Sequence, residues 1–82
     1  MKLTRVISVY EKHGEDFIRE FSLDHISLEI LKKILNAKDD DPDLYSIYPI
    51  DKSIKDKLIL LVPELSLLNE SDVKLFYECF TE

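Results

Sequence analysis

The sequence predicts an α+β fold: a small antiparallel sheet, made of an N-terminal hairpin and a C-terminal strand, with two helices packed on one face. Alternating apolar residues near the N-terminus, two apolar stripes with helical spacing, and an aromatic C-terminal run all point to this class. With 82 residues, the chain is expected to form a single domain over 1–82. One site or one interface is all that a domain of this size is expected to carry.

The first strand is expected over residues 2–10, where side chains alternate between two faces that are both partly apolar. The stretch KHGE at 12–15 holds the chain's one glycine, a residue that takes positive φ without a steric penalty from Cβ. A second alternating segment, FIREFSL, follows at 17–23. These three features together predict a β-hairpin.

A first helix is expected over roughly 28–37. Ser27 is a favourable N-cap, and the leucines at 28, 31 and 35 form an apolar stripe on one side. Asn36 and the neighbouring lysines suit the C-terminal end, where cations interact well with the helix dipole. The segment is therefore predicted to form an amphipathic helix that covers part of the core.

A second helix is expected over about 53–61, because Ser53 and Asp56 resemble a capping box. Pro63 would end it by disfavouring helical geometry at the preceding residue. The final run VKLFYECFTE fits both helical and strand spacing. Its aromatic and β-branched residues favour a strand.

The composition narrows the class of partner. Seventeen acidic and eleven basic residues give a net charge of -6, which argues against nucleic acid because phosphate contacts require excess lysine and arginine. A basic protein partner is more compatible with the negative electrostatic field of such a chain. Cys79 is the one cysteine, so no internal disulfide is expected and the cytoplasm is the default compartment. Neither a signal peptide nor a run of membrane-spanning length is recognisable, so no membrane contact is expected.

Metal binding is not expected. The aspartates at 39, 41 and 43 have the spacing of the first ligands in an EF-hand loop, but Leu44 stands where that loop needs glycine. Ile50 occupies the position of the bidentate glutamate. The single cysteine and two histidines show none of the paired spacings that structural zinc sites use.

Enzymatic activity and a bound cofactor are not expected either. With one glycine, the chain has no GxSxG-type nucleophile elbow and no glycine-rich phosphate loop. Paired carboxylates are abundant, but acid–base catalysis needs a partly dry pocket that an 82-residue domain has little room to build. A small carboxylate enzyme is therefore the third and least favoured interpretation.

The segment KDDDPDLYSIYPI at 38–50 combines four carboxylates with two tyrosines, which supplies both charge and contact area for an interface. Solvation alone is the alternative for the carboxylates, and core packing is the alternative for the tyrosines. The predicted partner-binding residues are Asp39, Asp40, Asp41, Asp43, Tyr45, Tyr48 and, as a weaker candidate, Glu78.

Four stretches in order, RVISVYEK, LEILKKIL, DDP followed by YSIYPI, and FYEC, together resemble immunity proteins of contact-dependent growth inhibition and polymorphic toxin systems. Related sequences are often classed only as a domain of unknown function. The resemblance implies a stoichiometric inhibitor that binds one cognate toxin domain, commonly a nuclease, inside the producing bacterium. Asp43 departs from the pattern, which tends to have an apolar residue there, and a glycine usual near the end of the first helix is missing. The loop geometry and the toxin's identity therefore do not carry over.

The negative net charge and the resemblance both point to a basic partner. A nuclease must attract phosphate and therefore tends to present a basic surface. We therefore expect an immunity protein that neutralises the C-terminal domain of a basic, nuclease-like toxin. The alternative is a small acidic interaction or regulatory module that has no toxin partner.

Overall fold

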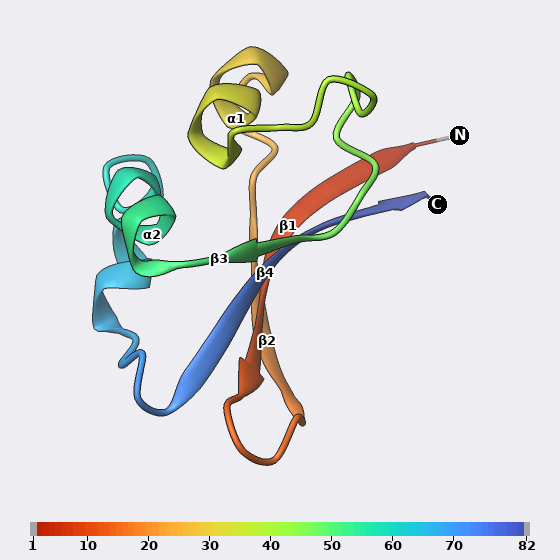
Figure 1. Cartoon of the computed structure of the whole chain (residues 1–82). Helices are drawn as coiled ribbons and strands as arrows, with labels where there is room; N and C mark the ends of the chain where they lie inside the picture. Colours follow the sequence, from red (N-terminus) through yellow and green to blue (C-terminus); the bar gives the residue numbers. More distant parts are fainter. Residues whose placement is uncertain (1, 82) are drawn as a thin grey trace.

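The computed structural model describes residues 2–81 and contains one four-stranded antiparallel sheet with helices on one face (Figure 1). The order of the strands across the sheet is β2-β1-β4-β3. This arrangement confirms the predicted α+β class. The elements are β1 (Leu3–Glu11), β2 (Phe17–Ser22), α1 (Leu28–Leu35), β3 (Tyr48–Ile50), α2 (Lys52–Leu58), the 3-10 helix η1 (Pro63–Leu67) and β4 (Val73–Thr81).

The predicted hairpin is confirmed, but its turn is built differently from the expectation. Glu15 takes the left-handed conformation, with φ of 61°, and Gly14 does not. A Cβ on Gly14 would meet the carboxylate at the end of the exposed Glu11 side chain, which is flexible and can move aside, so neither φ nor space requires glycine at this position. A register shift between Val9 and Tyr10 accompanies the turn.

Helix α1 begins as predicted, with the Ser27 hydroxyl accepting a hydrogen bond from the Ile30 N–H at 3.3 Å. It ends at Leu35, two residues before the predicted boundary, because Asn36 adopts the left-handed conformation with φ of 52°. Asparagine tolerates this conformation better than most residues. Asn36 therefore provides the left-handed C-cap that ends α1.

Helix α2 is shorter than predicted and is capped by a different residue. The Asp51 carboxylate accepts from the Ile54 N–H at 2.8 Å, so the N-cap lies two residues before the predicted Ser53. The helix ends at Leu58. Pro63 lies in the first turn of η1, where its fixed φ is favourable and its missing N–H costs nothing.

Strand β3 was missed by the sequence analysis. It has three residues and contains Pro49, which cannot donate to a sheet and is tolerated because β3 lies at the edge. Its pairing partner is β4, with Tyr48 opposite Tyr77. The C-terminal run is a strand, as the aromatic content indicated, and its last residue, Glu82, lies outside the described residues.

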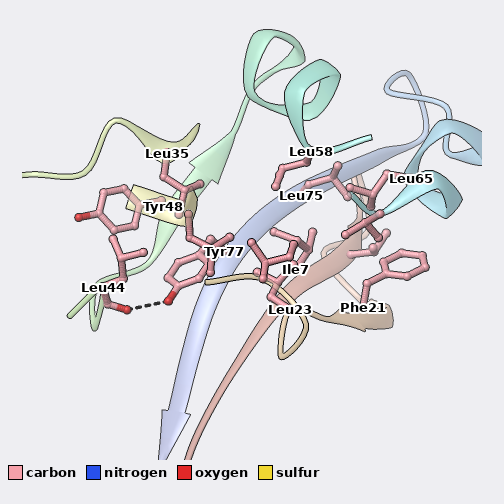
Figure 2. Packing of buried hydrophobic residues seen from close by; sticks show 14 residues of the cluster. Ile7, Phe21, Leu23, Leu35, Leu44, Tyr48, Leu58, Leu65, Leu75 and Tyr77 are labelled. Carbon is pink, nitrogen blue, oxygen red and sulfur yellow. Dashed lines mark hydrogen bonds between the residues drawn. The ribbon is translucent and has the colours of Figure 1, made fainter. Parts of the chain in front are cut away.

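The core lies between the sheet and the two helices, and Tyr77 and Leu58 within it are fully buried (Figure 2). Alternate residues of β1 and β4 point into it, which is why Ile7, Val9 and Leu75 are buried with Tyr77. None of the helices within residues 2–81 has the length and apolarity required to cross a membrane.

Lys55 of α2 is an unexpected buried cation. Its ammonium donates to the Leu68 carbonyl at 2.9 Å and to the Glu70 carboxylate at 3.1 Å. Both partners lie in the connection between η1 and β4. The lysine therefore fastens that connection to α2 and satisfies its own charge.

Candidate functional site

The predicted partner-binding segment forms a loop between α1 and β3, here called the acidic loop and defined as residues 38–47. It passes near the start of β1 and the end of β4, at one end of the sheet (Figure 1). Leu44 inserts fully into the core, and the Tyr77 hydroxyl donates to its carbonyl at 2.9 Å (Figure 2). The Arg5 guanidinium donates to the carbonyl of Asp43 at 2.9 Å. Contacts with two strands therefore hold the loop in place.

Asp41 organises the acidic loop from inside. The residue is only 7% exposed. Its carboxylate accepts hydrogen bonds from the backbone N–H groups of Tyr45 at 2.8 Å and Ser46 at 3.2 Å. The Tyr48 hydroxyl donates to the same carboxylate at 2.7 Å and accepts from the Lys38 N–H at 3.3 Å. One carboxylate and one hydroxyl thus connect both ends of the loop.

These contacts favour the ionised form of Asp41. The hydrogen bond from Tyr48 lowers the pKa of the Asp41 carboxyl most, and the N–H groups of Tyr45 and Ser46 lower it further, against an opposing effect of burial. Burial and the hydrogen bond to Asp41 raise the pKa of the Tyr48 hydroxyl. Burial also raises the pKa of Tyr77 to about 12. The two tyrosines are therefore neutral donors to the loop at neutral pH.

The prediction that all four aspartates and both tyrosines face a partner does not fit this geometry. Asp41 is turned inward because three donors converge on it, and Tyr48 packs in the core at 7% exposure. Core packing, the alternative kept open for the tyrosines, therefore describes Tyr48. The predicted residues of the loop that remain exposed are Asp39, Asp40, Asp43 and Tyr45.

Tyr45 is the one large aromatic on the exposed side of the acidic loop, with 57% of its surface accessible. It borders a hollow of about 420 Å³ that Leu3, Cys79 and Thr81 also line. The hollow is formed at the ends of β1 and β4. Charge and an exposed ring thus lie on one short, fixed segment.

Lysines gather where helix α1 leads into the acidic loop. Lys32, Lys33 and Lys38 line a second hollow of about 250 Å³ together with Asp39. None of the ion pairs formed among residues 2–81 includes Asp39, Asp40 or Asp43. The three carboxylates are therefore solvated and available to an incoming cation.

Glu78 lies apart from the other predicted residues. It is on β4, directly opposite Val6, and its side chain points to the sheet face that the helices leave uncovered. The hydroxyl of Ser8 donates to it, and that of Tyr10 donates at 3.2 Å. The seven predicted residues thus divide among the exposed loop, the interior and the opposite face of the sheet.

Sequence reasoning missed the neighbours of Glu78, among them Tyr10, Phe76 and Ile47. The signal that could have revealed them is the apolar character of both faces of the first strand, since only one face of this sheet is covered by helices. No group of three or more His, Cys, Asp or Glu side chains within the described part of the chain is arranged to hold a metal ion.

Comparison with known proteins identifies a family. Residues 4–76 match the family described as a domain of unknown function, DUF7683, and the chain belongs to it. The match runs from β1 into β4 and includes the whole acidic loop. Neither the curated proteins nor the solved structures give a match. The family description names no activity, so the expected relation to immunity proteins stays a prediction.

Proposed function

We propose that this chain is an immunity protein that binds and neutralises one cognate bacterial toxin domain in the cytoplasm, using its acidic loop as the contact surface. The observation that carries the proposal is the exposure of Asp39, Asp40 and Asp43 on a loop whose backbone is fixed. The ordered resemblance of the sequence to immunity proteins and the net charge of -6 support it.

The fixed loop favours tight binding because little conformational entropy remains to be lost on association. Asp41, Leu44 and Tyr77 already hold the backbone in one arrangement. Binding then has to order only the exposed carboxylates and the ring of Tyr45. This kind of preorganisation is typical of inhibitors that dock without large rearrangement.

The charge on the loop suits a basic toxin such as a nuclease. Three unpaired carboxylates attract a basic surface over several ångströms and raise the association rate. In a phosphate-binding cleft they would occupy positions that substrate phosphates need. Tyr45 would add apolar contact area, as tyrosines at the centre of interfaces often do. No catalytic step is required of the inhibitor.

The molecule is large enough to provide an interface of standard size. A standard complex takes about 800 Å² from each partner. The accessible surface is 5390 Å², so one such interface would use roughly a seventh of it. The acidic loop, with the start of β1 and the end of β4 beside it, is a natural centre for a surface of this extent.

Co-expression with the C-terminal domain of the protein encoded directly upstream tests the proposal. We expect the two chains to co-purify as a 1:1 complex and the immunity chain to restore growth of cells that the toxin domain alone would arrest. A toxic upstream domain that does not bind this chain, and whose effect it does not relieve, would contradict the proposal. Binding to a basic partner without any effect on growth would instead favour an acidic interaction module.

A further inference from the structure

The sheet face opposite the helices carries a row of aromatic rings. The ring of Tyr10 on β1 contacts that of Phe17 on β2 at a centroid distance of 5.7 Å and that of Phe76 on β4 at 5.9 Å. Both contacts are edge-to-face, with interplanar angles of 71° and 74°. Phe17 is 55% exposed. We call this face the open face.

A hollow of about 270 Å³ lies beside the row. Its lining residues are Tyr10, Glu15, Ile47, Lys74, Phe76 and Glu78. A water molecule occupies about 30 Å³ in the liquid, so the hollow can admit the end of one long side chain. The walls of the hollow combine aromatic and aliphatic groups with charged side chains, among them two carboxylates.

Glu78 is held in the hollow without a cation. Hydroxyls of Ser8 and Tyr10 donate to its carboxylate, and none of the ion pairs in the described part of the chain includes it. Lys74 also lines the hollow, but its ammonium lies 3.5 Å from the Glu15 carboxylate, so these two charges compensate each other. Glu78 is then the uncompensated charge of the hollow.

We infer that this hollow binds an arginine side chain of a partner protein. A carboxylate can accept about four hydrogen bonds, and two donors leave lone pairs on Glu78 for a guanidinium. A planar guanidinium also stacks on aromatic rings, which Tyr10 and Phe76 supply. Ile47 would contact the aliphatic stem of the arginine.

The surroundings of the hollow favour a protein over a small cation. Ile47 in the hollow is 62% exposed, and Phe17 and Phe80, which are 55% and 45% exposed, extend the apolar surface beyond it. Aromatic and apolar surface is typical of the centre of protein interfaces, where arginine is the charged residue that is enriched. Glu20, which lies opposite Ser8, adds a further negative charge to this face and repels nucleic acid.

The hollow shares Ile47 with the acidic loop, but its carboxylate lies on the other face of the sheet from the contacts that anchor the loop in the core. Glu78 and the acidic loop's core contact Tyr77 are adjacent in β4, so their side chains leave the sheet on opposite sides. The inference does not require the partner to be a toxin, because it depends only on the chemistry of the hollow.

An NMR titration of the ¹⁵N-labelled chain with the peptide acetyl-Gly-Arg-Gly-amide tests the inference. The same peptide with citrulline, which keeps the shape of arginine and lacks its charge, is the matched ligand. We expect the arginine peptide to shift the signals of Tyr10, Phe76 and Glu78 first, and the citrulline peptide to bind about tenfold more weakly, as expected for loss of a charged hydrogen bond.

Two variants complete the test. Glu78→Gln should weaken the arginine peptide about tenfold, whereas Glu20→Gln, an exposed carboxylate of the same face outside the hollow, should leave its affinity within about twofold. Phe76→Leu should also weaken binding while keeping the strand apolar. Equal binding of the citrulline peptide, an unchanged affinity in Glu78→Gln, or an equal loss in Glu20→Gln would overturn the inference.

Discussion

Asp41 and Glu78 are two carboxylates that each accept a hydrogen bond from a tyrosine hydroxyl, and yet they serve the molecule differently. Asp41 receives two backbone N–H groups in addition to Tyr48, and together these donors enclose it. Glu78 receives the hydroxyls of Ser8 and Tyr10 and borders a hollow. The first carboxylate orders a loop, whereas the second is held ready for a ligand.

The difference follows from where each residue lies in the chain. The loop around Asp41 turns tightly, with Leu44 in the left-handed conformation at φ of 55°, and therefore presents its N–H groups inward. Backbone donors in a strand are engaged in the sheet, so Glu78 finds side-chain hydroxyls only. Backbone donors therefore give Asp41 a structural role. Glu78, at the surface of the sheet, can still accept hydrogen bonds from a ligand.

Replacing Asp41 should produce the largest effect. Asp41→Ala leaves three donors without an acceptor, and we expect the midpoint of thermal unfolding to fall by about 10 °C. Asp40→Ala, an exposed neighbour, should change the midpoint by no more than about 2 °C. Calorimetry of both variants checks this, and equal midpoints would show that Asp41 has no ordering role.

Tyr48→Phe should have the next largest effect. It removes the donor to Asp41 and the acceptor for the Lys38 N–H while keeping the ring in the core. We expect the free energy of unfolding to fall by about 1 to 2 kcal/mol in urea titrations. Tyr45→Phe is the matched control, since its ring is exposed, and a similar loss in both variants would contradict the network.

Acid should weaken the loop through the same carboxylate. Folding lowers the pKa of Asp41 from its ordinary value of 3.8, so its stabilisation is present above that value and is lost as the pH falls through the lower pKa of the folded state. In Asp41→Asn this part of the dependence is absent. We therefore expect the stability difference between wild type and Asp41→Asn to shrink between pH of about 6 and about 2. A constant difference would contradict the assignment.

Glu78→Gln should change stability least. The amide oxygen still accepts from a hydroxyl, and the hollow beside it stays accessible to water. We expect a change in the free energy of unfolding of less than about 1 kcal/mol, measured in urea beside Asp41→Asn. If both variants are equally destabilised, Glu78 is a structural group like Asp41.

The fold class followed from local patterns that the structure keeps. Alternation in β1 and β2, the Ser27 cap and the aromatic content of β4 each act locally, so the sequence displays them directly. Strand β3 has three residues and a proline, and it exists because β4 provides a pairing partner distant in sequence. No local pattern could have indicated it.

The site was predicted only in part, for a related reason. Acidic and aromatic residues at 39–48 led to the prediction of a contact segment, but sequence alone does not tell which carboxylate turns inward. That choice depends on Tyr48, which β3 directs into the core, and on Leu44, which Tyr77 holds from β4. The hollow at Glu78 depends likewise on β1, β4 and Ile47 meeting in space.

The association rate with the toxin domain tests most directly whether the exposed carboxylates of the acidic loop contact a basic partner. The variant Asp39→Asn/Asp40→Asn/Asp43→Asn removes three charges and leaves Asp41 and its network unchanged. Stopped-flow mixing with the upstream C-terminal domain should give an association rate constant reduced at least about tenfold at low salt, with a smaller difference at high salt. A rate constant that is unchanged at both salt concentrations would contradict the contact role of the loop.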